Sequence, residues 1–255
     1  MSIWGKTVCI APRRVRIIAA FLAVALLALC AFYPSSPALA QPHSVSEPSL
    51  GSGASKSFQP SAVSANAHPA QRLIFIGDSL TAGFFAHDPA HGYAALTASA
   101  LHVRYSVQSQ YGVTAMFTAR KMQASKGLAV PADTQEAVIE LGTNDVFASG
   151  ETLTRFRTAY DYILTRVRHD APQAKIVCLG TWRAPAQGGR FDEIIRSDCV
   201  RLVGGSYVGL SRFYLNATYR GPAGRVTAFG TSDDFHPNNA GHKAISTALL
   251  AALSS

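Results

Sequence analysis

The chain has 255 residues, of which 48% are hydrophobic and 15% are charged, and its formal net charge is +8. This length and composition are those of one globular domain with accessory segments. No run of basic residues with interleaved aromatic side chains occurs, so the positive charge does not indicate a nucleic-acid-binding protein.

The first forty residues have the order of a secretory signal peptide. An apolar run over residues 17–32 follows a basic end, and the small residues up to Ala40 follow the run. The run is shorter than the ~20 residues that span a bilayer. We therefore predict cleavage after Ala40, an extracytoplasmic mature protein and no stable membrane insertion; the alternative is an uncleaved anchor. The basic residues are Lys6, Arg13, Arg14 and Arg16.

The predicted signal holds four of the 23 Lys and Arg residues and no acidic residue, so the remaining chain has a net charge of about +4. Residues 41–70 consist mainly of Ser, Ala, Pro and Gly and show neither a helical nor a strand period. Such a segment buries too little apolar surface to offset the entropy lost on ordering. We expect a disordered linker over 41–70.

The domain over residues 71–255 alternates predicted strands with predicted helices. Apolar runs that end at glycine predict buried strands, whereas apolar positions three and four residues apart predict helices. Strands are expected at 73–76, 137–141 and 175–179, with weaker ones at 103–107 and 208–214, and helices at 93–101, 114–125, 152–169, 191–203 and 238–253. The alternation predicts an α/β fold with three layers, α/β/α, around a central parallel sheet of about five strands.

Cys178 and Cys199 are the two cysteines that follow the predicted signal. An even pair in an oxidising compartment indicates one disulfide, and two buried free thiols are the alternative. Neither cysteine has the spacing to histidines that is typical of a zinc site. We expect no metal ion and no cofactor.

Three polar clusters follow predicted strands or precede the last helix. Gly77-Asp78-Ser79-Leu80 ends the first strand, Gly142-Thr143-Asn144-Asp145 ends the third, and Asp233-Asp234-Phe235-His236-Pro237 comes just before residue 238. Ligand sites of parallel sheets lie at the carboxyl ends of the strands. The three clusters are therefore expected to meet at one edge of the sheet.

The residue types in these clusters fit nucleophilic catalysis. A serine hydroxyl such as that of Ser79 needs a base to take its proton, and the base needs a third group to orient it. Asp233 and His236 are three residues apart, close enough for a turn to bring the carboxylate to the imidazole, and Pro237 favours that turn. The oxyanion would be bound by the amides of Ser79 and Gly112 and by the side chain of Asn144.

These four blocks resemble those of the GDSL/SGNH hydrolase superfamily. The first block is residues 77–80, the second contains Gly112, the third is Gly142-x-Asn144-Asp145, and the last is Asp233-x-x-His236. The resemblance covers residues 73–253 and implies a flavodoxin-like fold. It implies Ser79 as nucleophile, His236 as base, Asp233 as orienter, and Ser79, Gly112 and Asn144 as the oxyanion hole. The second block of the family usually has Asn where this chain has Gln110.

Each assignment has an alternative. Ser79 is also a residue type that caps helices, and Asn144 is also a turn former. Asp234 is adjacent to Asp233 and is an alternative orienter. Asp88 and His91 repeat the Asp-x-x-His spacing, but they follow Ser79 by about a dozen residues, and we interpret them as a loop feature. A structural or surface role is expected for His242, within the last helix.

The expected activity is hydrolysis of short-chain or O-acetyl esters of a small-molecule, polysaccharide or lipid substrate. Alternatives are a lysophospholipase or thioesterase, an O-acyltransferase, and an inactive surface-binding domain. Specificity is expected from the loops 81–93, 147–150, 181–190 and 216–235. Phe84, Phe85, Phe147 and Trp182 are candidates either for the substrate pocket or for the core.

Overall fold

The computed structural model of this chain describes residues 71–124, 127–150 and 152–255. The expected signal peptide over 1–40 and the expected linker over 41–70 lie outside these residues. Within the described ranges, no helix combines the length and the hydropathy that a bilayer crossing requires.

Five parallel strands form the central sheet, in the order β2-β1-β3-β4-β5. Because all five run in the same direction, their carboxyl ends share one edge of the sheet. The strands are β1 (Arg72–Gly77), β2 (Arg104–Ser109), β3 (Glu136–Glu140), β4 (Lys175–Leu179) and β5 (Ser206–Val208).

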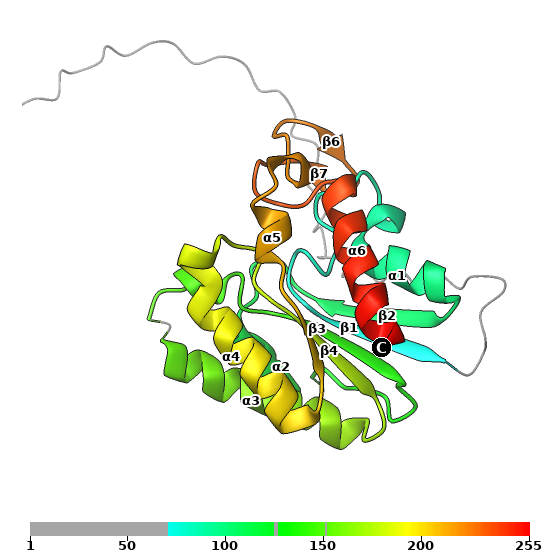
Figure 1. Ribbon diagram of the computed structural model, residues 1–255, viewed down its shortest axis with the longest axis vertical. Helices are drawn as coiled ribbons and strands as arrows, with labels where there is room; N and C mark the ends of the chain where they lie inside the picture. The colour runs from blue at the N-terminus through cyan, green and yellow to red at the C-terminus, as the bar shows by residue number, and fades with distance from the viewer. Residues whose placement is uncertain (1–70, 125–126, 151) are drawn as a thin grey trace, which may run out of the picture. The chain divides into compact units, whose positions relative to one another are not determined.

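Helices cover both faces of the sheet (Figure 1). One face carries α1 (Tyr93–Leu101) and α6 (Asn239–Ser254). The other face carries α2 (Ala115–Gln123), α3 (Leu153–Asp170) and α4 (Pro185–Val203). The predicted three-layer α/β/α fold with a five-stranded parallel sheet is confirmed.

The alternation of side chains along β1 divides the core into two. Leu73 and Phe75 point into the cluster under α1 and α6, whereas Ile74 and Ile76 point into the cluster under α2, α3 and α4. All four are fully buried. A strand covered on both faces is apolar at successive positions, which is why β1 shows a continuous apolar run.

Two predicted boundaries were wrong. The strand expected over 208–214 ends at Val208, and a short helix, α5 (Ser211–Tyr214), follows it. The aromatic residues of α5 pack on the core. A short apolar pattern does not show whether its buried residues belong to a helix or to a strand.

Helix α4 begins at Pro185, six residues before its predicted start at 191, so part of the expected loop 181–190 is helical. Gly188 and Gly189 weaken the helical signal of the first turns. A Cβ atom on Gly188 would lie 2.0 Å from Oγ1 of Thr181. The glycine therefore lets α4 approach the end of β4 closely, at the expense of helix propensity.

The connections at the carboxyl edge contain only short elements. Three 3₁₀ helices, η1 (Pro89–His91), η2 (Asp145–Phe147) and η3 (Ala217–Tyr219), follow β1, β3 and β5 respectively. A hairpin of β6 (Val226–Thr227) and β7 (Gly230–Thr231) precedes α6.

A disulfide joins Cys178 on β4 to Cys199 on α4. Both residues are fully buried in the core under α3 and α4. The predicted bridge is confirmed, and the alternative of two free thiols is wrong.

Candidate active site

Ser79 and His236 meet at the carboxyl edge of the sheet. Ser79 lies in the turn that follows β1, and His236 lies three residues before α6. The Oγ atom of Ser79 is 3.0 Å from Nε2 of His236, and both residues are buried. Turns rather than a regular helix follow Ser79, so the alternative that it caps a helix does not describe its position.

Asp233 fixes the imidazole from the other side. Its Oδ2 atom is 2.7 Å from Nδ1 of His236, and its Oδ1 atom accepts the backbone amides of Phe235 and His236 at 2.9 and 2.8 Å. Asp234 instead accepts the amide of Ala223 at 2.8 Å, away from the imidazole. The expected turn is present, and it presents Asp233, not Asp234, to His236.

The environment keeps His236 neutral and Asp233 ionised. Burial lowers the pKa of His236 below its ordinary value, against the opposing effect of Asp233, and the positive charge of Arg183 also lowers it. Burial alone would raise the pKa of Asp233, but hydrogen bonds from the backbone and side chain of His236 hold it below its ordinary value. An unprotonated imidazole next to a serine hydroxyl can accept its proton.

Two backbone amides are available beside these groups. Neither Ser79 nor Gly112 donates its amide hydrogen to another described residue. Gly112 has a φ angle of +67°, a conformation that favours glycine. The amide of Gln110 donates to the carbonyl of Gly77 at 3.3 Å, which holds the turn containing Gly112 beside the turn containing Ser79.

Asn144 lies at the same edge, but its side chain is already engaged. Its Nδ2 atom donates to Oδ2 of Asp78 at 2.8 Å and to the carbonyl of Val113 at 3.0 Å. An amide NH₂ group has two hydrogens, so an incoming oxyanion must share or replace one of these bonds. The side chain thereby connects the turns after β1, β2 and β3.

A buried pair of carboxyl groups next to Ser79 was not predicted from the sequence. Asp78 and Glu140 are both fully buried. Burial raises the pKa of Asp78 to about 6; burial, and then the charge of Asp78, raise the pKa of Glu140 well above its ordinary value. Glu140 accepts hydrogen bonds from Thr81 at 3.0 Å and Thr143 at 3.3 Å. The sequence did contain a sign of this pair, because Glu140 is a charged residue within the otherwise apolar run of β3.

Aromatic side chains form one wall of the site. Phe84 stacks on Phe229 with ring centroids 5.0 Å apart and contacts Tyr111 at 5.5 Å. Tyr111 also stacks over the ring of His236 at 6.4 Å, and Phe85 meets the same ring edge-on at 5.1 Å. Sequence analysis singled out Phe84 and Phe85 but not Tyr111 or Phe229.

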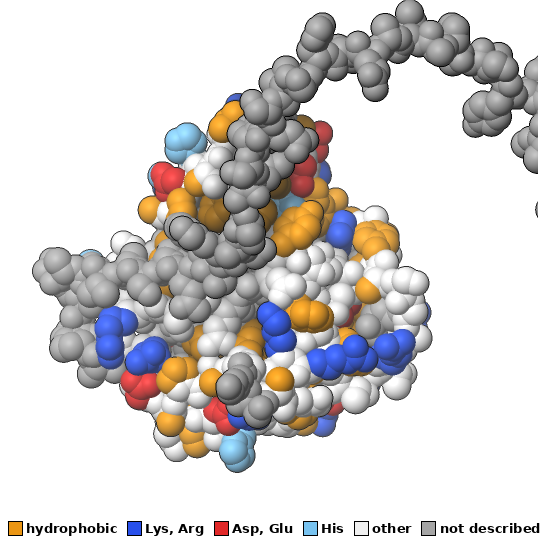
Figure 2. All heavy atoms as spheres, turned by 180° about the vertical axis from the view of Figure 1, so that it is seen from behind, with side chains coloured by type: hydrophobic (Ala, Val, Ile, Leu, Met, Phe, Trp, Pro, Cys, Tyr) orange, Lys and Arg blue, Asp and Glu red, His pale blue; other side chains and the backbone are white. Residues whose placement is uncertain are grey.

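A groove of about 890 Å³ begins at this wall and follows β2, one of the two edge strands of the central sheet. Its lining is mixed, with Phe84, Tyr111 and Phe229 beside Gln108, Gln110 and Lys121. In Figure 2, hydrophobic side chains reach the surface in both halves of the view, and most of the visible Lys and Arg side chains lie in the lower half.

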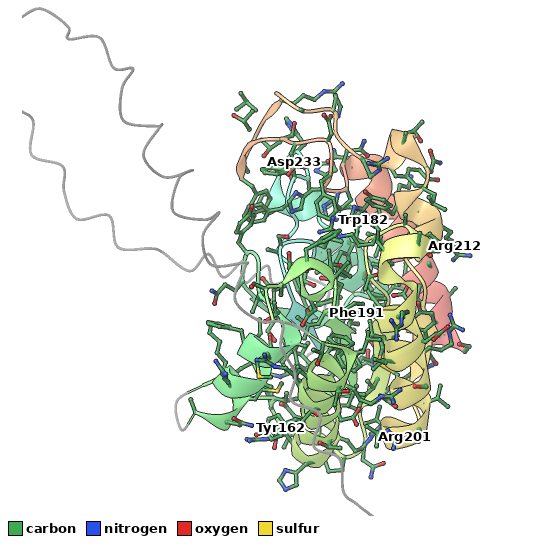
Figure 3. The ribbon with its side chains drawn as sticks, turned by 90° about the vertical axis from the view of Figure 1, so that its left-hand side faces the viewer. Tyr162, Trp182, Phe191, Arg201, Arg212 and Asp233 are labelled. Atoms are coloured by element: carbon green, nitrogen blue, oxygen red, sulfur yellow. A yellow bond between two sulfur atoms is a disulfide. The ribbon has the colours of Figure 1, made fainter. Side chains whose placement is uncertain are left out.

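Arg183 lies near His236, against two aromatic rings. The Cζ atom of its guanidinium lies 4.2 Å from the ring centroid of Phe235 and 4.6 Å from that of the exposed Phe147. Trp182 is fully buried, and its indole donates to the carbonyl of Phe235 at 2.8 Å. Trp182 is therefore a core residue that supports the turn of Asp233, and Figure 3 shows both near the same end of the domain.

The remaining histidine candidates lie elsewhere in the described structure. His91 and Asp88 pair with each other at 2.9 Å, but His91 is exposed, Asp88 is half-buried, and both belong to η1 and its cap. His242 is fully buried; its Nδ1 accepts the amide of Tyr93 at 3.3 Å, and its Nε2 donates to the carbonyl of Phe84 at 3.0 Å. Burial lowers the pKa of His242 to about 4. Its two hydrogen bonds join α6 to α1 and to the turn that contains Phe84, which fits the structural role expected for it. Within the described ranges, no group of three or more His, Cys, Asp and Glu residues forms a metal site.

The sequence profile of the GDSL-like Lipase/Acylhydrolase family matches residues 75–244, which include Ser79, Gly112, Asn144 and His236. The chain belongs to this family. The four sequence blocks predicted this membership. A comparison with curated proteins found no significant match.

Solved structures of the same fold include esterases and a phospholipase. A family two carbohydrate esterase from Clostridium thermocellum is 20% identical, with a TM-score of 0.55 over 72% of this chain and 63% of that chain. A carbohydrate esterase family 2 enzyme from Corynascus thermopiles is 21% identical, with a TM-score of 0.57 over 75% and 69%. Phospholipase A1 from Streptomyces albidoflavus NA297 is 17% identical, with a TM-score of 0.54 over 72% and 98%. The chain thus spans less than two thirds of the length of the first of these proteins, and identities this low establish the shared fold alone.

Proposed function

We propose that this family member is a secreted serine esterase in which Ser79 forms an acyl-enzyme. The observation that carries the proposal is the 3.0 Å contact between Oγ of Ser79 and Nε2 of His236, with Asp233 bound to the other imidazole nitrogen. A nucleophile, a base and an orienting group in this order are the parts of a serine hydrolase triad.

In the proposed reaction, Nε2 of His236 takes the proton of Ser79 as Oγ attacks the ester carbonyl. The amides of Ser79 and Gly112 and the side chain of Asn144 stabilise the resulting oxyanion. The C–O bond to the alcohol then breaks, and His236 gives its proton to the departing oxygen. Water repeats the two steps on the acyl-enzyme, which releases the acid and restores Ser79.

We propose short acyl groups, including O-acetyl groups on sugars, as the substrates. The groove beside Tyr111 is open and lined by both polar and aromatic side chains, which suits a hydrophilic chain better than a long acyl tail. The carbohydrate esterases among the structural relatives agree with this choice. The aromatic wall of Phe84, Tyr111 and Phe229 favours the second candidate, a longer acyl chain as in a phospholipase.

Rates on the 4-nitrophenyl esters of acetate, butyrate and octanoate distinguish the two candidates. We expect the highest kcat/KM on acetate or butyrate, and a maximum on octanoate would support the second candidate. Adding a sugar as acceptor to the reaction with the acetate ester tests acyl transfer. A transferase would form the acetylated sugar in place of free acetate.

The Ser79→Ala variant tests the mechanism itself. We expect kcat to fall by at least ~10⁴-fold while the melting temperature stays near that of the wild type. Ser246→Ala is the matched control, since Ser246 is a buried serine on α6 that bonds to Thr97. Undiminished hydrolysis by Ser79→Ala would refute the proposal.

We also propose that export removes residues 1–40. The mass of the exported protein is then expected to correspond to an amino terminus at Gln41. Recovery of an intact Met1 would support the uncleaved anchor.

A further inference from the structure

Arg183 is held next to the proposed catalytic groups by three contacts. The rings of Phe147 and Phe235 lie 4.6 and 4.2 Å from its guanidinium carbon, and its Nε donates to the carbonyl of Thr143 at 3.2 Å. Phe235 directly precedes His236, and Thr143 directly precedes Asn144. The guanidinium therefore lies between the turn that carries the base and the turn that carries an oxyanion donor.

Arg183 forms no ion pair within the described part of the chain, although the more distant charge of Asp78 acts to raise its pKa. No carboxylate oxygen of those residues lies within 4.0 Å of it, whereas Arg157, Arg166 and Arg201 each pair with an aspartate. The hydrogen bond to Thr143 uses Nε, and neither of the two Nη atoms donates a hydrogen bond to another described residue. The donors of the outer edge of the guanidinium are thus available.

The position is costly for a cation. Arg183 is partly buried, and burial lowers its pKa from the ordinary value of arginine. Its charge also lowers the pKa of His236, the base on which the proposed reaction depends. The first turn of α4, which begins two residues later without a side-chain cap, adds partial positive charge. An anionic group bound at this point would neutralise both sources of charge.

We propose that Arg183 binds a carboxylate of the substrate next to the ester, so that the enzyme prefers short-chain esters of acidic sugars over those of neutral sugars. The proposal rests on the esterase function proposed above and names its substrate class. The planar guanidinium presents two parallel donors that match the two oxygens of a carboxylate. The positive charge of Arg183, which forms no ion pair with the described residues, can pair with one carboxylate. The rings of Phe147 and Phe235 hold its guanidinium group in place.

The test compares an anionic ester with a neutral ester of the same shape, 4-acetoxybenzoate and 4-acetoxybenzamide. The quantity measured is the ratio of their kcat/KM values at pH 8, where His236 is neutral with or without Arg183. Differences in intrinsic reactivity are the same for every enzyme variant and cancel between them. The variants are Arg183→Gln, Arg183→Lys and the control Arg190→Gln, which removes an exposed positive charge from α4.

We expect Arg183→Gln to lower the anionic-to-neutral ratio roughly 10- to 100-fold, which is the effect of losing a hydrogen bond to a charged group. Arg183→Lys should restore part of the ratio, because the charge returns without the planar fork. Arg190→Gln should leave the ratio within about 2-fold of the wild type, as expected for an exposed charge.

An unchanged ratio in Arg183→Gln would overturn the proposal. An equal loss on both esters would also overturn it, because Arg183 would then only position Thr143 and Phe235. Failure of the wild type on both esters would refute the esterase function as well. An active wild type whose ratio is the same as that of Arg183→Gln would refute the carboxylate site alone. A third anionic ester, an acetylated glycerophosphodiester, tests a phosphodiester as the bound group. If Arg183→Gln lowered kcat/KM on this ester but not on 4-acetoxybenzoate, Arg183 would bind a phosphodiester and the acidic-sugar assignment would be overturned.

Discussion

The side-chain amide of Asn144 lies 2.8 Å from Oδ2 of Asp78, although the two residues are 66 positions apart in the chain. The same amide nitrogen lies 3.0 Å from the carbonyl oxygen of Val113, next to Gly112. One side chain thus fixes the relative positions of the turns that supply all three proposed oxyanion donors.

Replacing this side chain should affect both rate and stability. Asn144→Ala removes an oxyanion donor, so we expect kcat to fall by about 10²- to 10³-fold with a smaller change in KM. It also removes the hydrogen-bond donor to Oδ2 of the buried Asp78, which should lower the free energy of unfolding by about 1–3 kcal/mol. Steady-state kinetics and urea unfolding measure the two effects. Asn216→Ala, at an exposed cap of η3, is the control, and a full rate in Asn144→Ala would contradict the assignment.

Neighbouring aspartates provide a matched pair of variants. Asp233→Asn removes the carboxylate that binds Nδ1 of His236, and we expect kcat to fall by about 10³- to 10⁴-fold through loss of the correct tautomer. Asp234→Asn should keep its rate, because Asp234 accepts only the amide of Ala223 among the described backbone groups. Equal losses in the two variants would show that the orienter has been assigned to the wrong residue.

The pH dependence of the rate follows from the lowered pKa of His236. The proposed base works only when neutral, so kcat/KM should rise with pH through this pKa and level off above it. Because burial and Arg183 lower the pKa, the midpoint is expected below 6.5, the ordinary value for histidine. Arg183→Gln should move the midpoint upward. A midpoint above 6.5 in the wild type would contradict the electrostatic description.

The carboxyl pair under Ser79 should make stability depend on pH. The pKa values of Asp78 and Glu140 are raised in the folded state, so their contribution is full below pH 4 and is lost as pH rises through the folded pKa values, about 6 for Asp78. Glu140→Gln keeps an oxygen acceptor for Thr81 and Thr143 and takes up no proton. Between pH 5 and 7 the wild type should lose stability relative to this variant, by up to about 1.4 kcal/mol per pH unit.

Urea unfolding across this pH range measures the difference between the two proteins. Glu140→Ala serves as the contrast, because it removes the acceptor and should cost about 2 kcal/mol or more at every pH. Parallel stability curves for the wild type and Glu140→Gln would show that Glu140 is ionised when the protein is folded.

The disulfide should contribute to stability rather than to catalysis. Cys178 and Cys199 enclose a sequence separation of 21 residues, for which loop closure predicts about 3 kcal/mol. The double variant Cys178→Ala, Cys199→Ala should lose about this much in urea unfolding and keep its esterase rate at 25 °C. A loss below about 1 kcal/mol would contradict this expectation.

Residues whose roles depend on neighbours in the sequence could be predicted. Residues whose roles depend on contacts between distant elements could not. The buried runs of β1, β3 and β4 each end in a glycine, and the Asp233–His236 turn needs only neighbouring residues, so the sequence indicated both. Arg183 and Tyr111 reach the site from the ends of β4 and β2. Arg183 belongs to none of the four blocks, and Tyr111 lies between the two positions that define the second block. Their positions depend on the strand order and on packing against Phe235 and Phe84, which no local pattern encodes.

Glu140 shows a second limit of sequence reasoning. A lone acidic residue in an apolar strand is recognisable, but its partners Asp78 and Thr81 come from another strand end more than 50 residues away. The early start of α4 was missed for a related reason, since Gly188 there serves close packing against Thr181. In both cases the residue type reflects a contact between elements that only the folded chain brings together.

The 157 positions between Ser79 and His236 also impose an order in time. A chain that leaves the ribosome from its amino terminus presents the serine long before the histidine exists. A nascent chain that ends just after β5 contains every strand of the central sheet but still lacks the imidazole of His236. The proposed pair of nucleophile and base can therefore form only after synthesis has passed β5 and reached His236.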